Sequence, residues 1–367
     1  MIAVNTPLLS GNELKYITEC ITSGWISSEG PFVASFERKF SEYVNRKFGI
    51  AVSNGSAALD IAIRALNFNK GDEIIMPTFT IISPAQSIVT NGCIPVLVDS
   101  DPNTWNIDIN KIEGKITTKT KAILVVHIYG LPVDMNPILH LCKKYNLKLI
   151  EDAAEMHGQT YFNHMCGSFG DISIFSFYPN KHITTGEGGM IVTNDEKLKD
   201  RCLKLRNLAF ETNSRRFVHH EIGWNYRMTN MQAAIGLAQL EKIEYHLERK
   251  REIGNLYYEA LKDLEFFKLQ QYKTEYSENI YWVFGLVAVN EDLCLRTVSR
   301  LNEKGIGTRP FFWCMHEQPV FRNMNLFLNE KHPVAENIAR CGFYLPSGLG
   351  LTNEEVNTVI NILLEVI

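Results

Sequence analysis

Residues 169–194 read FGDISIFSFYPNKHITTGEGGMIVTN, an apolar run that reaches Pro179, presents Lys181 and returns through a glycine-rich turn. A lysine acts as a nucleophile only when its amine is neutral, and a free lysine, with a pKa near ~10.4, is protonated in water. Burial favours the neutral amine, because desolvation disfavours the charged form. A single lysine is most often a solvated surface residue, so the prediction of Schiff-base chemistry at Lys181 depends on the rest of the chain.

The composition is that of an ordinary globular protein. The chain has 367 residues, of which 45% are hydrophobic and 21% charged, enough for one large domain with a sizeable core and a smaller second domain. The formal net charge is -4, and the two signs are interspersed without a run of lysine or arginine. We therefore expect small-molecule partners, and neither nucleic acid nor a membrane.

Cysteine usage and the N-terminal residues favour a cytoplasmic location. The eight cysteines are scattered without a Cys-x-x-Cys pair, in a chain too long to need disulfides for stability. The first residues, MIAVNTP, lack the charged start, apolar core and cleavage site of a signal peptide. No apolar run approaches the ~18 residues that a membrane-spanning helix needs.

The first two thirds of the chain alternate β-branched runs with amphipathic helical patterns, which is typical of an α/β fold with a mostly parallel sheet. Seven strands are predicted, at residues 48–53, 72–77, 94–99, 121–127, 147–152, 171–177 and 189–193. Helices are predicted at residues 55–67, 83–91, 135–145 and 195–206, where they allow right-handed crossovers.

The last third predicts a smaller α+β domain. A long helical pattern runs from Thr229 toward Leu261 and forms a bridge between the domains. It is followed by a strand-like run at 281–289 and a helix at 293–304, and the chain ends in another helix after Asn353. We place the domains at residues 1–240 and 241–367, with the N-terminal segment packing near the smaller one.

Three predicted strands end in residues with relevant chemistry, and open α/β sheets bind ligands at these ends. Gly55 and Ser56 open a helix whose N-terminus suits a phosphate, although an Asn-Gly turn with a serine cap explains the same residues. Asp152 is able to hold a pyridine nitrogen protonated, or equally to cap a helix. Ser176 precedes Lys181 by five residues and adds a hydroxyl for the phosphate.

A phosphate cradle, a pyridinium partner and a Schiff-base lysine are the groups that pyridoxal 5'-phosphate requires, and they occur in one consistent order. We therefore predict this cofactor, cycling with its pyridoxamine form. A metal site is not expected, because the acidic residues and histidines between 151 and 164 lack the tight spacing of metal ligands.

Four segments resemble the DegT/StrS nucleotide-sugar aminotransferases, and the similarity covers nearly the whole chain. They are residues 54–59, 151–155, 176–189 and 223–230. The resemblance implies an aspartate aminotransferase-like fold of type I. Within the family the chain is most similar to the GDP-perosamine synthases, which transfer an amino group to C4 of a nucleotide-linked 4-keto-6-deoxyhexose. That activity implies amino-sugar biosynthesis for a surface polysaccharide, and leaves open whether the sugar serves a lipopolysaccharide O-antigen, a capsule or a glycoprotein.

The resemblance also implies roles for individual residues. Lys181 would form the Schiff base and act as general acid and base, while Asp152 would keep the ring nitrogen protonated. Glu155 would lie near the ring hydroxyl, and Ile81 would cover the ring where many relatives carry an aromatic residue. Asn225 would reach the phosphate of a neighbouring subunit, so that the site would lie across a homodimer interface. The cofactor phosphate would be held by Gly55, Ser56 and Ser176.

The substrates implied by the resemblance are L-glutamate as amino donor and a nucleotide-linked keto sugar as acceptor. Both are anionic, and Arg227 and Arg309 are the candidate partners because a guanidinium binds carboxylate or phosphate bidentately. An ordinary structural ion pair explains either arginine equally well. Trp25 and His316 are candidates for contacts with sugar and base, although such residues more often belong to a core.

Three alternatives remain open from the sequence. The enzyme could act at C3 or C4 of a UDP- or dTDP-linked sugar, because no residue identifies the base securely. A non-enzymatic regulator would need a DNA-binding element, and neither a helix-turn-helix pattern nor a basic face is found. A dehydratase branch of the family carries histidine in place of the lysine. Here Lys181 is retained beside His182, which favours transamination.

Overall fold

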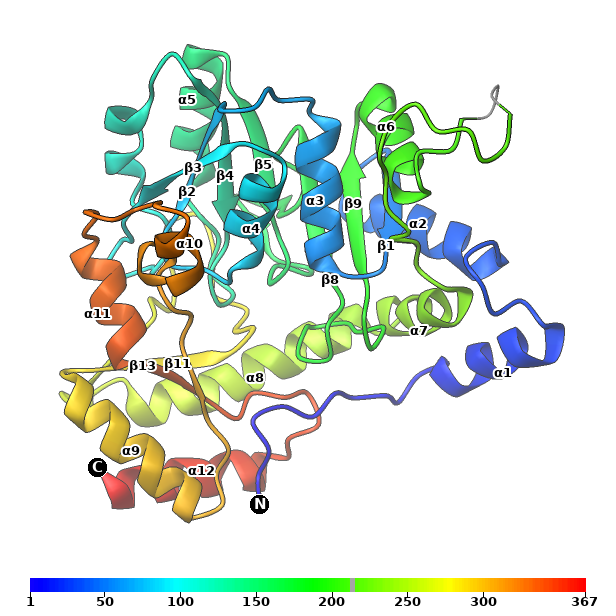
Figure 1. The fold of residues 1–367 in the computed structure, drawn as a ribbon. Helices are drawn as coiled ribbons and strands as arrows, with labels where there is room; N and C mark the ends of the chain where they lie inside the picture. The colour runs from blue at the N-terminus through cyan, green and yellow to red at the C-terminus, as the bar shows by residue number, and fades with distance from the viewer. Residues whose placement is uncertain (212–214) are drawn as a thin grey trace.

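The computed structural model describes residues 1–211 and 215–367, and its largest feature is a seven-stranded sheet of order β1-β9-β8-β5-β4-β2-β3 (Figure 1). Its strands are β1 (Phe48–Val52), β2 (Glu73–Pro77), β3 (Ile94–Val98), β4 (Thr120–Val126), β5 (Lys148–Asp152), β8 (Ile172–Ser176) and β9 (Gly189–Thr193). The predicted α/β class and all seven predicted strands are confirmed.

One strand of this sheet, β9, is antiparallel to both of its neighbours, β8 and β1. The cause is its connection: residues 177–188 return directly from β8 without a crossover helix, and a direct return produces an antiparallel pair. The other neighbouring pairs are parallel. The segment that carries Lys181 is this return loop, which lies beyond the carboxyl end of β8.

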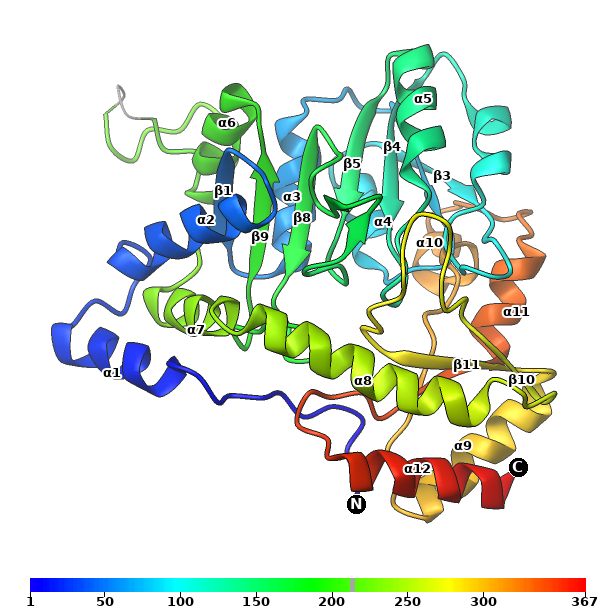
Figure 2. The ribbon, with the colours of Figure 1, turned by 180° about the vertical axis from the view of Figure 1, so that it is seen from behind.

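Helices cover both faces of the large sheet. Helices α3, α4 and α6 lie on the face seen in Figure 1, and α2 and α5 lie on the opposite face, seen in Figure 2. Each strand therefore buries both of its faces: Leu124 and Val126 of β4 belong to one core cluster, and Ile123 and Val125 belong to the other. These helices are α2 (Pro31–Tyr43), α3 (Gly55–Ala65), α4 (Ser83–Thr90), α5 (Met135–Tyr145) and α6 (Glu196–Arg206).

The long helical pattern predicted from Thr229 to Leu261 is two helices, α7 (Asn230–Leu240) and α8 (Ile243–Leu261). The start is as predicted, because Thr229 and Gln232 form a capping box. The break is a short turn at Glu241 and Lys242, where the Glu241 carboxylate accepts hydrogen bonds from Asn12 and Tyr16 of the N-terminal segment, both at 2.7 Å. The prediction of one continuous helix is therefore wrong.

The second sheet is antiparallel, with the order β10-β11-β13-β12. Its strands are β10 (Phe267–Leu269), β11 (Phe284–Ala288), β12 (Arg309–Pro310) and β13 (Gly342–Leu345). The helices around it are α9 (Glu291–Glu303), α10 (Pro319–Asn323), α11 (Pro333–Cys341) and α12 (Asn353–Val366). The smaller α+β unit is thereby confirmed, while α10 and α11 were not predicted.

The N-terminal residues lie against this second unit, where Ile2 forms a bridge with Ile306, before the chain crosses to α1 (Glu13–Ser23). A small hairpin of β6 (Thr160–Tyr161) and β7 (His164–Met165) completes the strands described. The expected boundary at residues 240 and 241 coincides with the end of α7, and the division into two domains stays a prediction. In the described ranges, the helices all fall short of the length and apolar character needed to cross a membrane.

Candidate active site

A cavity of about 510 Å³ lies at the carboxyl ends of the central strands, between the large sheet and residues of the second sheet. Its size is in the range of pockets for small molecules. Eight of the predicted site residues line it: Gly55, Ser56, Ile81, Asp152, Glu155, Ser176, Lys181 and Arg309. The cavity thus brings together residues from strand ends that lie far apart in the sequence.

Lys181 presents its amine inside this cavity. The Nζ atom lies 3.8 Å from Glu155 Oε1 and 3.9 Å from the centroid of the Trp282 ring, and the side chain is 9% exposed. Burial lowers the pKa of Lys181, against the opposing effect of the Glu155 and Asp152 carboxylates. The site therefore favours the neutral amine that a nucleophile requires.

Asp152 is the last residue of β5, and its side chain faces the cavity. One carboxylate oxygen accepts the backbone N–H of Ala154 at 3.0 Å. Desolvation raises the pKa of Asp152 to about 6, while that hydrogen bond and the charge of Lys181 oppose the shift. The carboxylate is therefore mostly ionised at neutral pH and is able to hold a proton on a cationic ring nitrogen.

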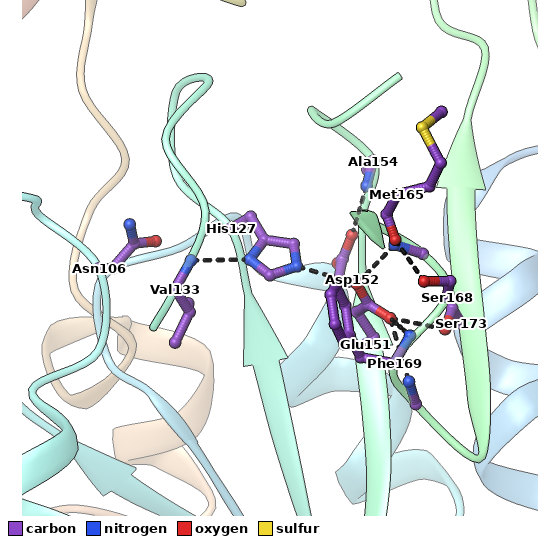
Figure 3. Close-up of polar contacts among 12 residues, drawn as sticks. Asn106, His127, Val133, Glu151, Asp152, Ala154, Met165, Ser168, Phe169 and Ser173 are labelled. Atoms are coloured by element: carbon purple, nitrogen blue, oxygen red, sulfur yellow. Dashed lines mark hydrogen bonds and ion pairs between the residues drawn. The ribbon is translucent and has the colours of Figure 1, made fainter. Parts of the chain in front are cut away.

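The adjacent Glu151 points the other way, because successive side chains of a strand alternate between faces. Figure 3 shows it among the backbone of the loop that precedes β8, where it accepts the N–H groups of Gly167, Phe169 and Gly170. His127 Nδ1 accepts the N–H of Val133 at 3.0 Å, so its Nε2 carries the proton and donates to Glu151 at 3.2 Å. Glu151 is a structural carboxylate, outside the cavity.

Glu155 is the second carboxylate in the cavity. Its Oε2 accepts the backbone N–H of Tyr129 at 2.8 Å, which aims the other oxygen at Lys181. Burial raises the pKa of Glu155 to about 8, although the charge of Lys181 opposes this. Because the same burial lowers the pKa of Lys181, the pair tends toward its uncharged forms.

The N-terminus of α3 forms the polar end of the cavity. Asn54 caps this helix by accepting the N–H of Ala57 at 2.8 Å, and Ser56 Oγ lies 2.7 Å from Ser83 Oγ. A Cβ atom on Gly55 would lie only 2.9 Å from the Cβ of Ser176, so glycine keeps this approach open. Free N–H groups, the helix dipole and two serine hydroxyls suit an anion such as a phosphate.

Arg309 is the one of the two predicted anion-binding arginines that lines the cavity. Arg227 is held elsewhere, because its guanidinium donates to Asn225 Oδ1 at 2.8 Å and to Asn207 Oδ1 at 2.6 Å. Asn225 is itself exposed and Trp25 is 51% exposed, and neither lines the cavity of its own chain.

His316 is not placed in the cavity, contrary to the expectation that it faces the cleft. It is 1% exposed, with Nδ1 2.8 Å from Thr78 Oγ1 and Nε2 3.0 Å from Glu336 Oε1. Both ring nitrogens are therefore occupied: Nδ1 contacts the residue after β2 of the large sheet, and Nε2 contacts α11 of the second unit. The nearby Glu317 and Glu336 are both paired with Arg340, which supplies the positive charge at this cluster.

Several cavity residues were not identified from the sequence. They are Asn54, Thr80, Ser83, Tyr178, Asn180, Glu187, Trp282 and Tyr344, among others. Trp282 is the most informative, because its ring covers the Lys181 amine and its indole Nε1 donates to the Asn180 carbonyl at 2.8 Å. Its only sequence signal was a position in a strand-like run, which is equally typical of a core residue.

Residues 7–364 match the DegT/DnrJ/EryC1/StrS aminotransferase family. The chain belongs to this family. It is 44% identical to GDP-perosamine synthase from Escherichia coli O157:H7, over 97% of this chain and 95% of that protein. It is 39% identical to dTDP-3-amino-3,6-dideoxy-alpha-D-galactopyranose transaminase from Aneurinibacillus thermoaerophilus, over 93% of this chain and 91% of that protein. The enzyme is thus a sugar aminotransferase dependent on pyridoxal phosphate.

The fold of the enzyme is that of solved sugar aminotransferases. Helicobacter pylori PseC, an aminotransferase involved in the biosynthesis of pseudoaminic acid, superimposes with a TM-score of 0.93 at 25% identity, covering 100% of this chain and 98% of that one. The cavity suits the cofactor: an amine, an ionised carboxylate and an anion cradle surround one space of suitable volume. The aspartate aminotransferase-like class and the predicted cofactor are therefore confirmed.

Proposed function

We propose that this enzyme transfers an amino group from L-glutamate to C4 of a GDP-linked 4-keto-6-deoxyhexose. The similarity to GDP-perosamine synthase over nearly the whole length of both chains carries this proposal. The cavity supports it, because it combines a buried amine with an arginine suited to an anionic substrate. The product would be an amino sugar for a surface polysaccharide.

In this proposal Lys181 Nζ is the atom that gains and loses protons during the reaction. Its low exposure and lowered pKa favour the neutral amine, the form that is able to accept a proton from the substrate carbon. Asp152 maintains a protonated ring nitrogen, and Ser56, Ser83 and Ser176 hold the phosphate at the end of α3. When bound, pyridoxal phosphate supplies the electron sink that lets an amino group move between two carbons.

Arg309 is the proposed partner of the substrate anions. It lies in β12, at the edge of the second sheet, and lines the cavity. The reaction needs one site to accept first glutamate and then the keto sugar, and a guanidinium is able to pair with the carboxylate of one and the diphosphate of the other. Replacing Arg309 by glutamine should raise KM for both substrates.

We also propose that the enzyme acts as a homodimer with shared sites. Asn225 is exposed and lies outside the cavity of its own chain, as a residue that serves a second subunit should. The contact between Asn225 and Arg227, at 2.8 Å, would orient the amide toward a partner. In this arrangement each cavity is completed only by the neighbouring chain.

The test is a substrate panel. Purified enzyme with pyridoxal phosphate and glutamate is offered 4-keto- and 3-keto-6-deoxy sugars linked to GDP, UDP or dTDP, and products are identified by mass spectrometry and NMR. Amination of the GDP-linked 4-keto sugar at C4 is expected. Preferred amination at C3 of a dTDP-linked sugar would favour the activity named for the Aneurinibacillus relative. No amination of the GDP-linked 4-keto sugar would overturn the proposal.

A further inference from the structure

A second buried lysine lies behind Lys181. Lys250 is in the middle of α8, the long helix that runs from the large sheet along the second unit (Figure 2). It is 2% exposed, although lysine is rarely buried without partners. It does not line the cavity.

The Lys250 amine holds two backbone carbonyls of the second unit. Its Nζ donates to the Trp282 carbonyl at 2.8 Å and to the Ser347 carbonyl at 2.5 Å. Two turns further along α8, the hydroxyl of Tyr257 donates to the Pro346 carbonyl at 2.9 Å. The same helix face therefore holds Trp282, two residues before β11, and Pro346 and Ser347, the two residues after β13.

The Lys250 amine is able to bond both carbonyls in either protonation state. Burial lowers the pKa of Lys250 to about 7, and the charge of Lys181 adds to the effect. A neutral amine still has two N–H donors, and two carbonyls accept them. The hold on Trp282 is therefore maintained after the amine loses its proton.

Trp282 connects this contact to the active site. Its ring lies over Lys181 Nζ at 3.9 Å, while its indole N–H is bonded to the carbonyl of Asn180 at 2.8 Å. The preceding Tyr281 has φ 51, a left-handed conformation that is unfavourable for a bulky residue and persists only when neighbouring contacts determine it. The Lys250 bond to the next carbonyl is such a contact.

Helix α8 also contacts the lysine loop directly. His246, one turn before Lys250, donates from Nδ1 to the carbonyl of His182 at 2.9 Å. Since residues four apart share a helix face, His246 and Lys250 form one surface against which the loop and Trp282 are packed. This surface is defined by side chains of α8 and lies outside the cavity.

We propose that Lys250 is a positioning residue, which holds Trp282 over the Lys181 amine and so excludes water from it. The inference rests on the proposed role of Lys181. The Trp282 ring removes solvent on one side of the amine, which favours the neutral form, while the ring face attracts the ammonium; burial is the larger effect on the pKa of Lys181. Other titratable groups that face Lys181 are Asp152, Glu155, His157 and His182.

The test measures how the reactivity of the Lys181 amine depends on pH, in the apoprotein and without turnover. Acylation of Lys181 by acetic anhydride is followed by peptide mass spectrometry as a function of pH. Lys250→Met keeps the length of the side chain but removes both donors, and Lys262→Met makes the same change at an exposed position after α8. The pH at which acylation of Lys181 is half-maximal is the midpoint. We expect this midpoint to rise by roughly one pH unit in Lys250→Met and to stay unchanged in Lys262→Met.

Trp282→Phe is the second variant, because it keeps the carbonyl and loses the indole bond to Asn180. Trp282→Phe should also raise the midpoint of Lys181 acylation. Lys250→Met also removes an amine whose charge acts on Lys181, so support for the inference requires a rise in Trp282→Phe, which keeps Lys250. An unchanged midpoint in either folded variant overturns the inference. Failure of the proposed function is seen separately, as the absence of a cofactor label on Lys181 after borohydride reduction.

Discussion

Glu151 and Asp152 are neighbours in the sequence and face opposite sides of the large sheet. Asp152 lines the cavity that contains Lys181, whereas Glu151 accepts three backbone N–H groups of the loop before β8. Strand alternation thus separates a carboxylate for chemistry from a carboxylate for structure. The two residues should respond differently to the same isosteric change.

The first prediction compares Asp152→Asn with Glu151→Gln. Asp152→Asn should lower kcat roughly 100-fold or more while leaving the protein folded, because an amide does not stabilise a cationic ring nitrogen. Glu151→Gln should reduce the free energy of unfolding by about 2–4 kcal/mol, because it leaves buried N–H donors without a charged acceptor. Kinetics and urea denaturation of both variants check this. Equal losses of stability would contradict the assignment.

The second prediction concerns Lys181. Lys181→Ala should lose amination of the keto sugar by at least about 1000-fold, because no other amine lines the cavity among the described residues. Borohydride reduction of the wild-type holoenzyme should leave a covalent label on the Lys181 peptide, detected by mass spectrometry. Lys143→Ala, an exposed lysine on α5, is the control and should keep both properties. Native turnover by Lys181→Ala would remove the basis of the mechanism.

The third prediction concerns pH. Burial raises the pKa of Glu155 to about 8, so at intermediate pH the folded protein keeps a proton that the unfolded chain has released. The stabilisation from this group is therefore complete below the unfolded pKa and is lost as pH rises through about 8. The unfolding free energy of the wild-type apoprotein, relative to Glu155→Gln, should fall by about 2–3 kcal/mol between pH about 6 and about 9. Urea titrations of both proteins at both pH values check this. If the difference in unfolding free energy between wild type and Glu155→Gln were the same at both pH values, the raised pKa of Glu155 would be contradicted.

The fourth prediction tests the phosphate cradle. Gly55→Ala should weaken cofactor binding by roughly tenfold or more, because the added methyl group would meet the Cβ of Ser176 at 2.9 Å. Gly114→Ala is the matched control, since a Cβ at that position has no atom within 4 Å. Cofactor titration of the two apoproteins, followed by absorbance, compares the dissociation constants. Equal constants would place the phosphate elsewhere.

The fifth prediction tests the shared site. Lys181→Ala and Asn225→Ala should each be nearly inactive alone. When the two are unfolded and refolded together, mixed dimers would contain one site with both native residues, so the mixture should recover about a quarter of the wild-type activity. Assays before and after co-refolding, with the oligomeric state measured by light scattering, check this. No recovery would place Asn225 and Lys181 in the same chain's site, or exclude a dimer.

Much of the fold could be predicted because its signals are local. The β-branched runs, the capping box at Thr229 and the strand ends at Asp152 and Ser176 are each readable within a few residues. The break between α7 and α8 could not be predicted from the sequence, because it coincides with contacts from Asn12 and Tyr16, more than 200 residues earlier in the chain. Periodicity continues across such a turn and does not reveal it.

By itself, the sequence determined the class of fold, the cofactor and the eight predicted residues that meet in the cavity. These follow from short motifs at strand ends, which a parallel sheet brings to one edge. Only the tertiary structure decided that His316 packs away from the cavity, that the Trp282 ring covers the Lys181 amine and that Lys250 holds the Trp282 carbonyl. These positions depend on how the second unit packs against the large sheet. The local sequence pattern of a buried aromatic residue or lysine is the same whether its side chain lies in a core or in an active site.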